Sequence, residues 1–386
     1  MKKVMLCLVA VALLAGLATP AFAVTAEFKG AFRVRGFYDS SRLLNDASDN
    51  SHAWMDMRLR LQTTFVVSDS LSLVTRFDAL DNERWNSNDS LKNYVDMDRA
   101  YMKIKTQYGL FEVGRMAGRQ FGTTFEDTEI DADRIKYTLK YNDFIFLGVF
   151  EKIAEVDSTT FPAPDYSDSD AATYYLAGIY KTEPLESGIL FGYTVDKTAS
   201  DITLSKKPYD AAYWTVNPYF IYKFDAFAVQ GEAMFRTGKA KEYDRKLYSK
   251  VNAAMKDSDW DAFAYNLEGT YSYGPLSFQL GYAWMQGQGD NAKETDVKTL
   301  GTLGVDWSKL WILTCKENGD NLKGLGGQGN INGGVVGNNG AKIFYLGAGY
   351  KPFDNLALNF VYGNAKAEAP VKDSYSKDYG SEYDLT

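Results

Sequence analysis

The chain has 386 residues, of which 15% are aromatic, and it carries a formal net charge of −8 at pH 7. This acidity argues against a nucleic-acid partner, because nucleic-acid-binding surfaces are basic. The chain has two cysteines. Cys7 falls in a segment that we expect to be removed, which leaves Cys315 without an intrachain disulfide partner.

The N-terminus has the pattern of a secretory signal peptide. Lys2 and Lys3 precede an apolar run over residues 4–17, and Ala21-Phe22-Ala23 supplies the small-x-small cleavage pattern. We expect cleavage after Ala23, so residues 1–23 form the signal peptide and residues 24–386 form the mature, exported domain.

The mature chain alternates between apolar and polar residues with a period of two. It has no apolar run of about 18 residues, so a transmembrane helix is excluded. In residues 27–38, Phe32 and Val34 share one face while Arg33 and Arg35 share the other, and residues 54–65, 71–78 and 99–104 repeat this pattern. Such alternation predicts strands, and aromatic residues on a polar average are typical of a membrane barrel, although a soluble all-β protein could share that composition.

Short turns alternate strictly with long polar loops along the chain. The short turns are expected at residues 68–70, 107–109, 142–143, 182–186, 225, 274–275 and 352–355. The long loops are expected at residues 39–52, 80–94, 114–133, 156–171, 198–211, 238–258, 287–340 and 365–380. Seven turns and eight loops predict an all-β fold: a transmembrane antiparallel β-barrel of 16 strands, with short periplasmic turns and long extracellular loops.

The last predicted strand stops at Thr386 without the terminal aromatic residue that usually closes such barrels. We therefore expect a C-terminally truncated sequence, whose full-length form could have 18 strands.

Arginines recur on the polar face of the first four predicted strands. This basic strip consists of Arg33, Arg35, Arg58, Arg60, Arg76 and Arg99. On a lipid face each would cost about 2–4 kcal/mol at mid-membrane, so the strip is expected to face a water-filled lumen. The arginines then either line the constriction of a pore or are satisfied by carboxylates on neighbouring strands, such as Asp56, Asp78 and Glu112, and both can hold together.

The third predicted loop, within residues 114–134, carries a dense acidic run. Its carboxylates are Glu126, Asp127, Glu129, Asp131 and Asp133. We expect this loop to fold into the lumen and to form an eyelet with the basic strip, because opposed charges across a narrow gap filter ions. The alternative is an exposed acidic surface loop.

The layout resembles the Gram-negative general porins, in particular the outer-membrane homotrimeric porin family. The resemblance rests on the signal peptide, the sixteen alternating segments and three short runs: Val113-Gly114-Arg115, Asp131-Ala132-Asp133-Arg134 and Phe353-Asp354-Asn355-Leu356. It implies a homotrimer in the outer membrane of a Gram-negative bacterium, with the third loop inside the barrel. It also implies passive diffusion of ions and small hydrophilic solutes, contact with outer-membrane lipid and lipopolysaccharide, and no cofactor.

Other functions have less support in the sequence. His52, the only histidine, falls in a predicted loop, so we expect no enzyme. No metal site is expected, and Asp165, Asp168 and Asp170 are a weak candidate that lacks the EF-hand spacing. A substrate-specific channel for a sugar or an anion, with Tyr101, Tyr137 or Trp214 in an aromatic row, and a non-transporting adhesin or receptor barrel stay open.

Overall fold

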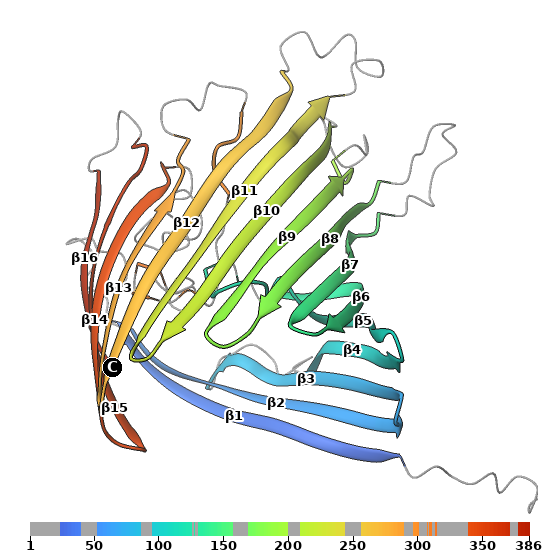
Figure 1. Ribbon diagram of the computed structural model, residues 1–386, viewed down its shortest axis with the longest axis horizontal. Helices are drawn as coiled ribbons and strands as arrows, with labels where there is room; N and C mark the ends of the chain where they lie inside the picture. The colour runs from blue at the N-terminus through green and yellow to red at the C-terminus, as the bar shows by residue number, and fades with distance from the viewer. Residues whose placement is uncertain are drawn as a thin grey trace, which may run out of the picture.

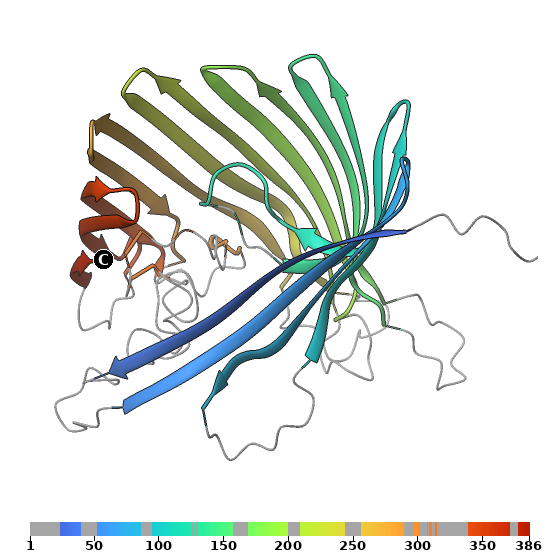
Figure 2. The same ribbon diagram turned by 90° about the horizontal axis from the view of Figure 1, so that it is seen from below.

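The computed structural model shows a single antiparallel sheet of sixteen strands, in which each strand pairs with the next one in sequence. It describes residues 24–39, 52–85, 95–125, 127, 130–156, 169–199, 209–243, 256–288, 296–300, 307, 309–310, 313–314, 339–370 and 377–386. Figures 1 and 2 show the sheet curving strongly from β1 to β16, which are its two edges. Within these residues no helix is long and apolar enough to cross a membrane.

The strand order follows the sequence around the wall. The strands are β1 (Thr25–Asp39), β2 (His52–Ser68), β3 (Leu71–Arg84), β4 (Val95–Thr106), β5 (Gly109–Gly118), β6 (Ile130–Tyr141), β7 (Phe144–Ala154), β8 (Ala171–Lys181), β9 (Leu185–Asp196), β10 (Tyr209–Phe224), β11 (Phe227–Tyr243), β12 (Ser258–Tyr273), β13 (Leu276–Met285), β14 (Ala341–Phe353), β15 (Leu356–Lys366) and β16 (Asp378–Leu385). All seven predicted short turns fall between paired strands, and the predicted sixteen-stranded antiparallel fold is confirmed.

The two faces of the sheet differ as the alternation predicts. On β1, Phe32 is 65% exposed on the convex face, which in a membrane is the lipid side. On the adjacent strand, Asp56 is only 4% exposed and bonds Arg35 on the concave side. Apolar side chains therefore face outward because lipid accepts them, while charged and polar side chains turn inward, where water or a partner can satisfy them.

The buried core lies on the inner side of β11–β15. Small wall residues such as Ala264, Ala283 and Ala341 leave space for the fully buried Phe125 and Trp307, which come from two different loops. The interior is thus partly filled by inward-folded loop segments that pack against one side of the wall.

Several strands run further than the sequence pattern indicates. β5 continues to Gly118 and β6 begins at Ile130, because Gly118 pairs with Ile130 and Ala117 pairs with Asp131. The third loop is therefore residues 119–129, not 114–133. Backbone pairing carries these strand ends through polar residues, where side-chain alternation gives no signal.

Other predicted features fall partly or wholly outside the described residues. These are the signal peptide (residues 1–23), Cys315 and most of the predicted loop over residues 287–340. His52 begins β2 opposite Asp39 at the rim of the sheet.

The face assignment makes a direct prediction for Leu59, which is 44% exposed near the middle of β2. Leu59→Arg places a guanidinium against lipid, and we expect it to lower the free energy of unfolding in vesicles by about 2–4 kcal/mol. Thr64→Arg adds the same charge to the inward face of the same strand, opposite Glu27, and should cost much less. Equal losses in urea titrations of the two variants would contradict the assignment.

Candidate functional site

The basic strip is held in register by direct strand pairing. Arg33 lies opposite Arg58 on the neighbouring strand, and Arg76 lies opposite Arg99. Like charges directly opposite each other destabilise a sheet, so this arrangement requires carboxylates between them.

Aspartates on the same strands supply those carboxylates. The Arg35 Nη2 atom lies 2.7 Å from Asp56 Oδ2, and Arg60 binds Asp78 through Nε at 2.7 Å and Nη2 at 2.6 Å. These bidentate pairs match the planar fork of the guanidinium to the two carboxylate oxygens. Each aspartate therefore neutralises an arginine on the preceding strand.

The same pattern continues across β3 and β4. Arg76 donates from Nε to Asp98 at 3.1 Å and from Nη2 to Asp131 at 2.8 Å, and Arg99 also pairs with Asp131. A β-bulge makes this possible: the pairing steps from Arg76–Arg99 to Phe77–Met97, which leaves Asp98 as the extra residue. Asp98 and Arg99 can then both reach inward although they are neighbours in sequence.

Together these side chains form a charge lattice on the inner wall. We use this name for Arg35, Arg58, Arg60, Arg76 and Arg99 with Asp56, Asp78, Asp81, Asp98 and Asp131. The carboxylates equal the arginines in number, so the lattice is close to neutral and presents alternating charge to the lumen. Of the partners suggested by the sequence, Asp56 and Asp78 bind arginines, whereas Glu112 pairs with Lys103 and Lys136.

The third loop runs along the concave side and is tethered to the far wall. The backbone N–H of Thr123 donates to Glu232 Oε2 on β11 at 2.8 Å, and the Thr123 hydroxyl bonds the same oxygen. Phe121 packs edge-on against Tyr219 on β10 with ring centroids 5.1 Å apart. Figure 2 shows this segment, in teal after β5, crossing the interior of the curved sheet.

A second segment, which the sequence analysis did not assign to the lumen, secures the third loop. It comes from the connection between β13 and β14 (residues 286–340), and we call its described part, residues 307–314 with their gaps, the inner insert. Trp307 packs edge-on against Phe125 of the third loop at 5.2 Å and against Tyr345 of β14 at 6.2 Å. The two loops therefore share one apolar contact inside the barrel.

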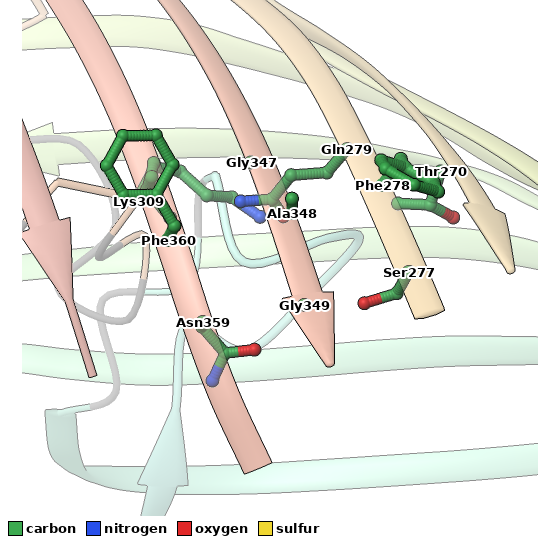
Figure 3. Close-up of a pocket in the computed structure, with 11 residues that line it drawn as sticks. Thr270, Ser277, Phe278, Gln279, Lys309, Gly347, Ala348, Gly349, Asn359 and Phe360 are labelled. Atoms are coloured by element: carbon green, nitrogen blue, oxygen red, sulfur yellow. The ribbon is translucent and has the colours of Figure 1, made fainter. Parts of the chain in front are cut away.

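Buried polar contacts fix the inner insert to the wall. Lys309 Nζ lies 2.7 Å from Glu268 Oε2, which also accepts from the Tyr345 hydroxyl at 2.6 Å. Figure 3 shows Lys309 among the residues that line a pocket on β12–β15, together with Gly347 and Gln279. Within the inner insert, the backbone N–H of Thr314 donates to the carbonyl of Leu310 at 3.1 Å.

The predicted acidic residues occupy different places. Asp131 lies in β6 and joins the charge lattice, while Asp133 pairs with Arg115 at 3.1 Å where both are half-exposed. Asp127 lies in the third loop itself, and Glu126 and Glu129 lie outside the described residues. Only part of the predicted acidic run is thus carried by the loop.

A second cationic group lies deeper on the wall and was missed in the sequence. Arg119 of the third loop and Arg134 of β6 share the carboxylate of Glu151, at 3.1 and 3.0 Å, and Glu151 is only 1% exposed. Burial, the largest single influence, lowers the pKa of Arg119, but the combined effects of its neighbours, chiefly Tyr175 and Glu151, outweigh burial and raise that pKa above its usual value. Arg119 therefore remains a cation. The period-two alternation of β6 and β7 puts Arg134 and Glu151 on the inward faces of their strands, and this pattern could have predicted the pair from the sequence.

The other candidates gain little support from their positions. Asp170 accepts from the backbone N–H of Val156 at 3.0 Å and pairs with Lys152, whereas Asp165 and Asp168 lie outside the described residues. The described part of the chain contains no cluster of potential metal ligands.

The three aromatic residues considered for a sugar slide do not form a row in the lumen. Trp214 is half-exposed on the outer face beside Tyr193, and Tyr137 packs on Phe111 and donates to the backbone of Tyr108. Tyr101 lies on β4, two strands from Tyr137 and six from Trp214 on β10, with Lys103 over its ring.

Comparison with known proteins agrees with this architecture. The family model of the Gram-negative porins matches residues 10–305. A structure of OccK8 (OprE) from Pseudomonas aeruginosa is 11% identical, covers 94% of this chain and 87% of its own, and gives a TM-score of 0.52. This likeness shows the fold alone. No curated protein matches the chain.

Two further solved structures are similar at lower scores. The trimer form of OmpT, an outer membrane protein of Vibrio cholerae, is 14% identical over 94% of this chain and 99% of its own, with a TM-score of 0.44. An anion-selective porin from Comamonas acidovorans is 12% identical over 94% of this chain and 98% of its own, with a TM-score of 0.47. The family match spans most of the sequence, and the chain is an outer-membrane channel protein that belongs to the Gram-negative porin family.

Proposed function

We propose that the protein forms a water-filled pore for passive diffusion of ions and small hydrophilic solutes across the outer membrane. The observation that carries this proposal is the tether of the third loop: Thr123 bonds Glu232, 109 positions away, on the inner wall. A loop held there narrows the lumen and leaves a passage beside it.

The passage is bounded on its other side by the charge lattice. We propose that the eyelet lies between the third loop, with Glu126, Asp127 and Glu129, and the basic strip on β1–β4. The five aspartates of the lattice offset five of the six arginines of the strip, and the loop carboxylates add negative charge from the opposite side. Charges of both signs at an eyelet act on passing ions, because rings of charge set the energy of ions that lose part of their hydration.

We also propose that the protein assembles as a homotrimer, as the family resemblance implies, and that outer-membrane lipid and lipopolysaccharide surround it. The exposed apolar side chains of the outer face, such as Phe146, Leu176 and Phe191, suit lipid and neighbouring subunits. Mass measurement of the protein extracted in mild detergent should give three times the chain mass. A mass equal to that of one chain in every mild detergent tested would contradict the proposed trimer.

Neutralising the loop carboxylates tests the eyelet. The variant Glu126→Gln/Asp127→Asn/Glu129→Gln removes three negative charges, and the reversal potential in a salt gradient across a planar bilayer should shift toward anion preference. The matched control, Asp143→Asn/Asp225→Asn/Asp354→Asn, removes three carboxylates from exposed short turns at the opposite rim. An identical reversal potential in both variants would take the loop out of the conduction path.

The tether itself can be broken at Gly122. This residue has φ +84°, and an added Cβ would collide with the Glu232 carboxylate. Gly122→Ala should therefore displace the third loop and raise the single-channel conductance. Gly269→Ala is the control, since nothing lies within 4 Å of its Cβ position. A conductance that stays at the wild-type value in both variants would show that the tether does not define the passage.

A further inference from the structure

A pocket of about 250 Å³ opens on the inner wall between β8–β11 and the third loop. Arg119 and Phe121 reach it from the loop, while Tyr175, Tyr213, Asn217 and Arg236 reach it from the strands. Ligand pockets for drug-sized molecules measure roughly 300–1,000 Å³, so this pocket suits a smaller organic solute.

Arg236 differs from the lattice arginines in its partners. Its guanidinium stacks on the rings of Tyr213 at 5.1 Å and Trp260 at 4.9 Å, and Nη1 makes one long contact of 3.4 Å to the carbonyl of Leu300. No carboxylate within the described residues lies at ion-pair distance from it, and its buried Nε has no hydrogen-bond acceptor. A buried donor without an acceptor costs free energy, so a ligand that brings an acceptor to the Arg236 guanidinium would remove that cost.

The charges around the pocket leave an excess of positive charge. Arg119 and Arg134 share the single carboxylate of Glu151. Glu232 is the other nearby carboxylate, and it is engaged by Thr123 and by Asn217 Nδ2 at 3.0 Å. The lining itself contains Arg119 and Arg236 and no carboxylate, and the three arginines of this region are set against two carboxylates, which favours one monovalent anion.

The other lining residues determine which organic group the anion can carry. Phe121, Met234 and Leu300 give apolar walls, and the tyrosine rings give flat surfaces against which a planar group can stack. The hydroxyls of Thr173 and Thr194 form a hydrogen bond with each other at 2.8 Å, which leaves them fewer hydrogen bonds to offer a ligand. The lining therefore combines a guanidinium for a carboxylate with apolar and aromatic surface for a ring.

We propose that this pocket binds a small aromatic monocarboxylate, with its carboxylate on Arg236 and Arg119 and its ring against Phe121 and Tyr213. The site would give the pore a preferred solute in addition to general diffusion. That consequence for transport rests on the proposed pore function, whereas binding itself does not.

Calorimetric titration of benzoate into the folded full chain in detergent tests the binding. We expect saturable uptake that Arg236→Gln weakens roughly tenfold or more, since the lost hydrogen bonds are to a charged group. Arg236→Lys should retain part of the affinity by keeping the charge. Lys239→Gln removes one charge from the same strand, where Lys239 pairs with Asp259 at 2.7 Å outside the pocket, and should bind as the wild type does.

Two reference solutes and a second measurement separate the outcomes. Acetate lacks the ring and benzyl alcohol lacks the charge, so both should bind much more weakly than benzoate. Uptake no greater than that of empty micelles, or equal affinity in the Arg236→Gln variant, would overturn the proposal.

In planar bilayers, benzoate should reduce the potassium chloride conductance to a saturating extent. Conductance without benzoate binding would support the proposed pore function and contradict the proposed binding pocket. Benzoate binding without any conductance would support the binding pocket and contradict the pore function.

Discussion

The structure depends on one constraint: charged side chains in a membrane-spanning sheet must face the interior and must be compensated there. Period-two alternation sends every lattice arginine to the same side as its neighbours, and strand pairing then sets Arg33 against Arg58 and Arg76 against Arg99. Aspartates at interleaved positions, and a bulge at Asp98, resolve the resulting repulsion. Removing one partner of a buried pair is costly because the other charge is left uncompensated.

The interior has two sides with different chemistry. On β1–β6 the inner wall carries the paired charges of the lattice, whereas on β11–β15 small residues accept Phe125 and Trp307 from two loops. Small residues on one stretch of wall and charged residues on the other thus decide where the loops rest. Glu232 and Glu268 hold the two loops through buried hydrogen bonds and an ion pair, so polar contacts fix positions that apolar packing alone would leave less specific.

Much of this fold could be predicted from the sequence, because alternation and turn residues are local signals. The turn positions and the opposite faces of residues such as Leu59 and Arg60 follow from spacing alone. The ends of strands could not be placed, since Asp131 continues β6 through backbone pairing with Ala117 and carries no apolar pattern. The contact of Trp307 with Phe125 was also out of reach, because it joins two loops 182 positions apart, and nothing local specifies their meeting.

The contact between Phe125 of the third loop and Trp307 of the inner insert bears on the path that a solute would take through the proposed pore. Because the third loop rests against β7–β11 and the inner insert against β12 and β14, the passage of the proposed pore would be displaced toward the arginines and aspartates of β1–β6. A zwitterion or a strongly dipolar molecule on this proposed off-centre route would meet alternating arginines and aspartates on one flank and the two loops on the other. It would therefore turn to a fixed orientation during transit, and two isomers of equal size and equal net charge would cross at different speeds.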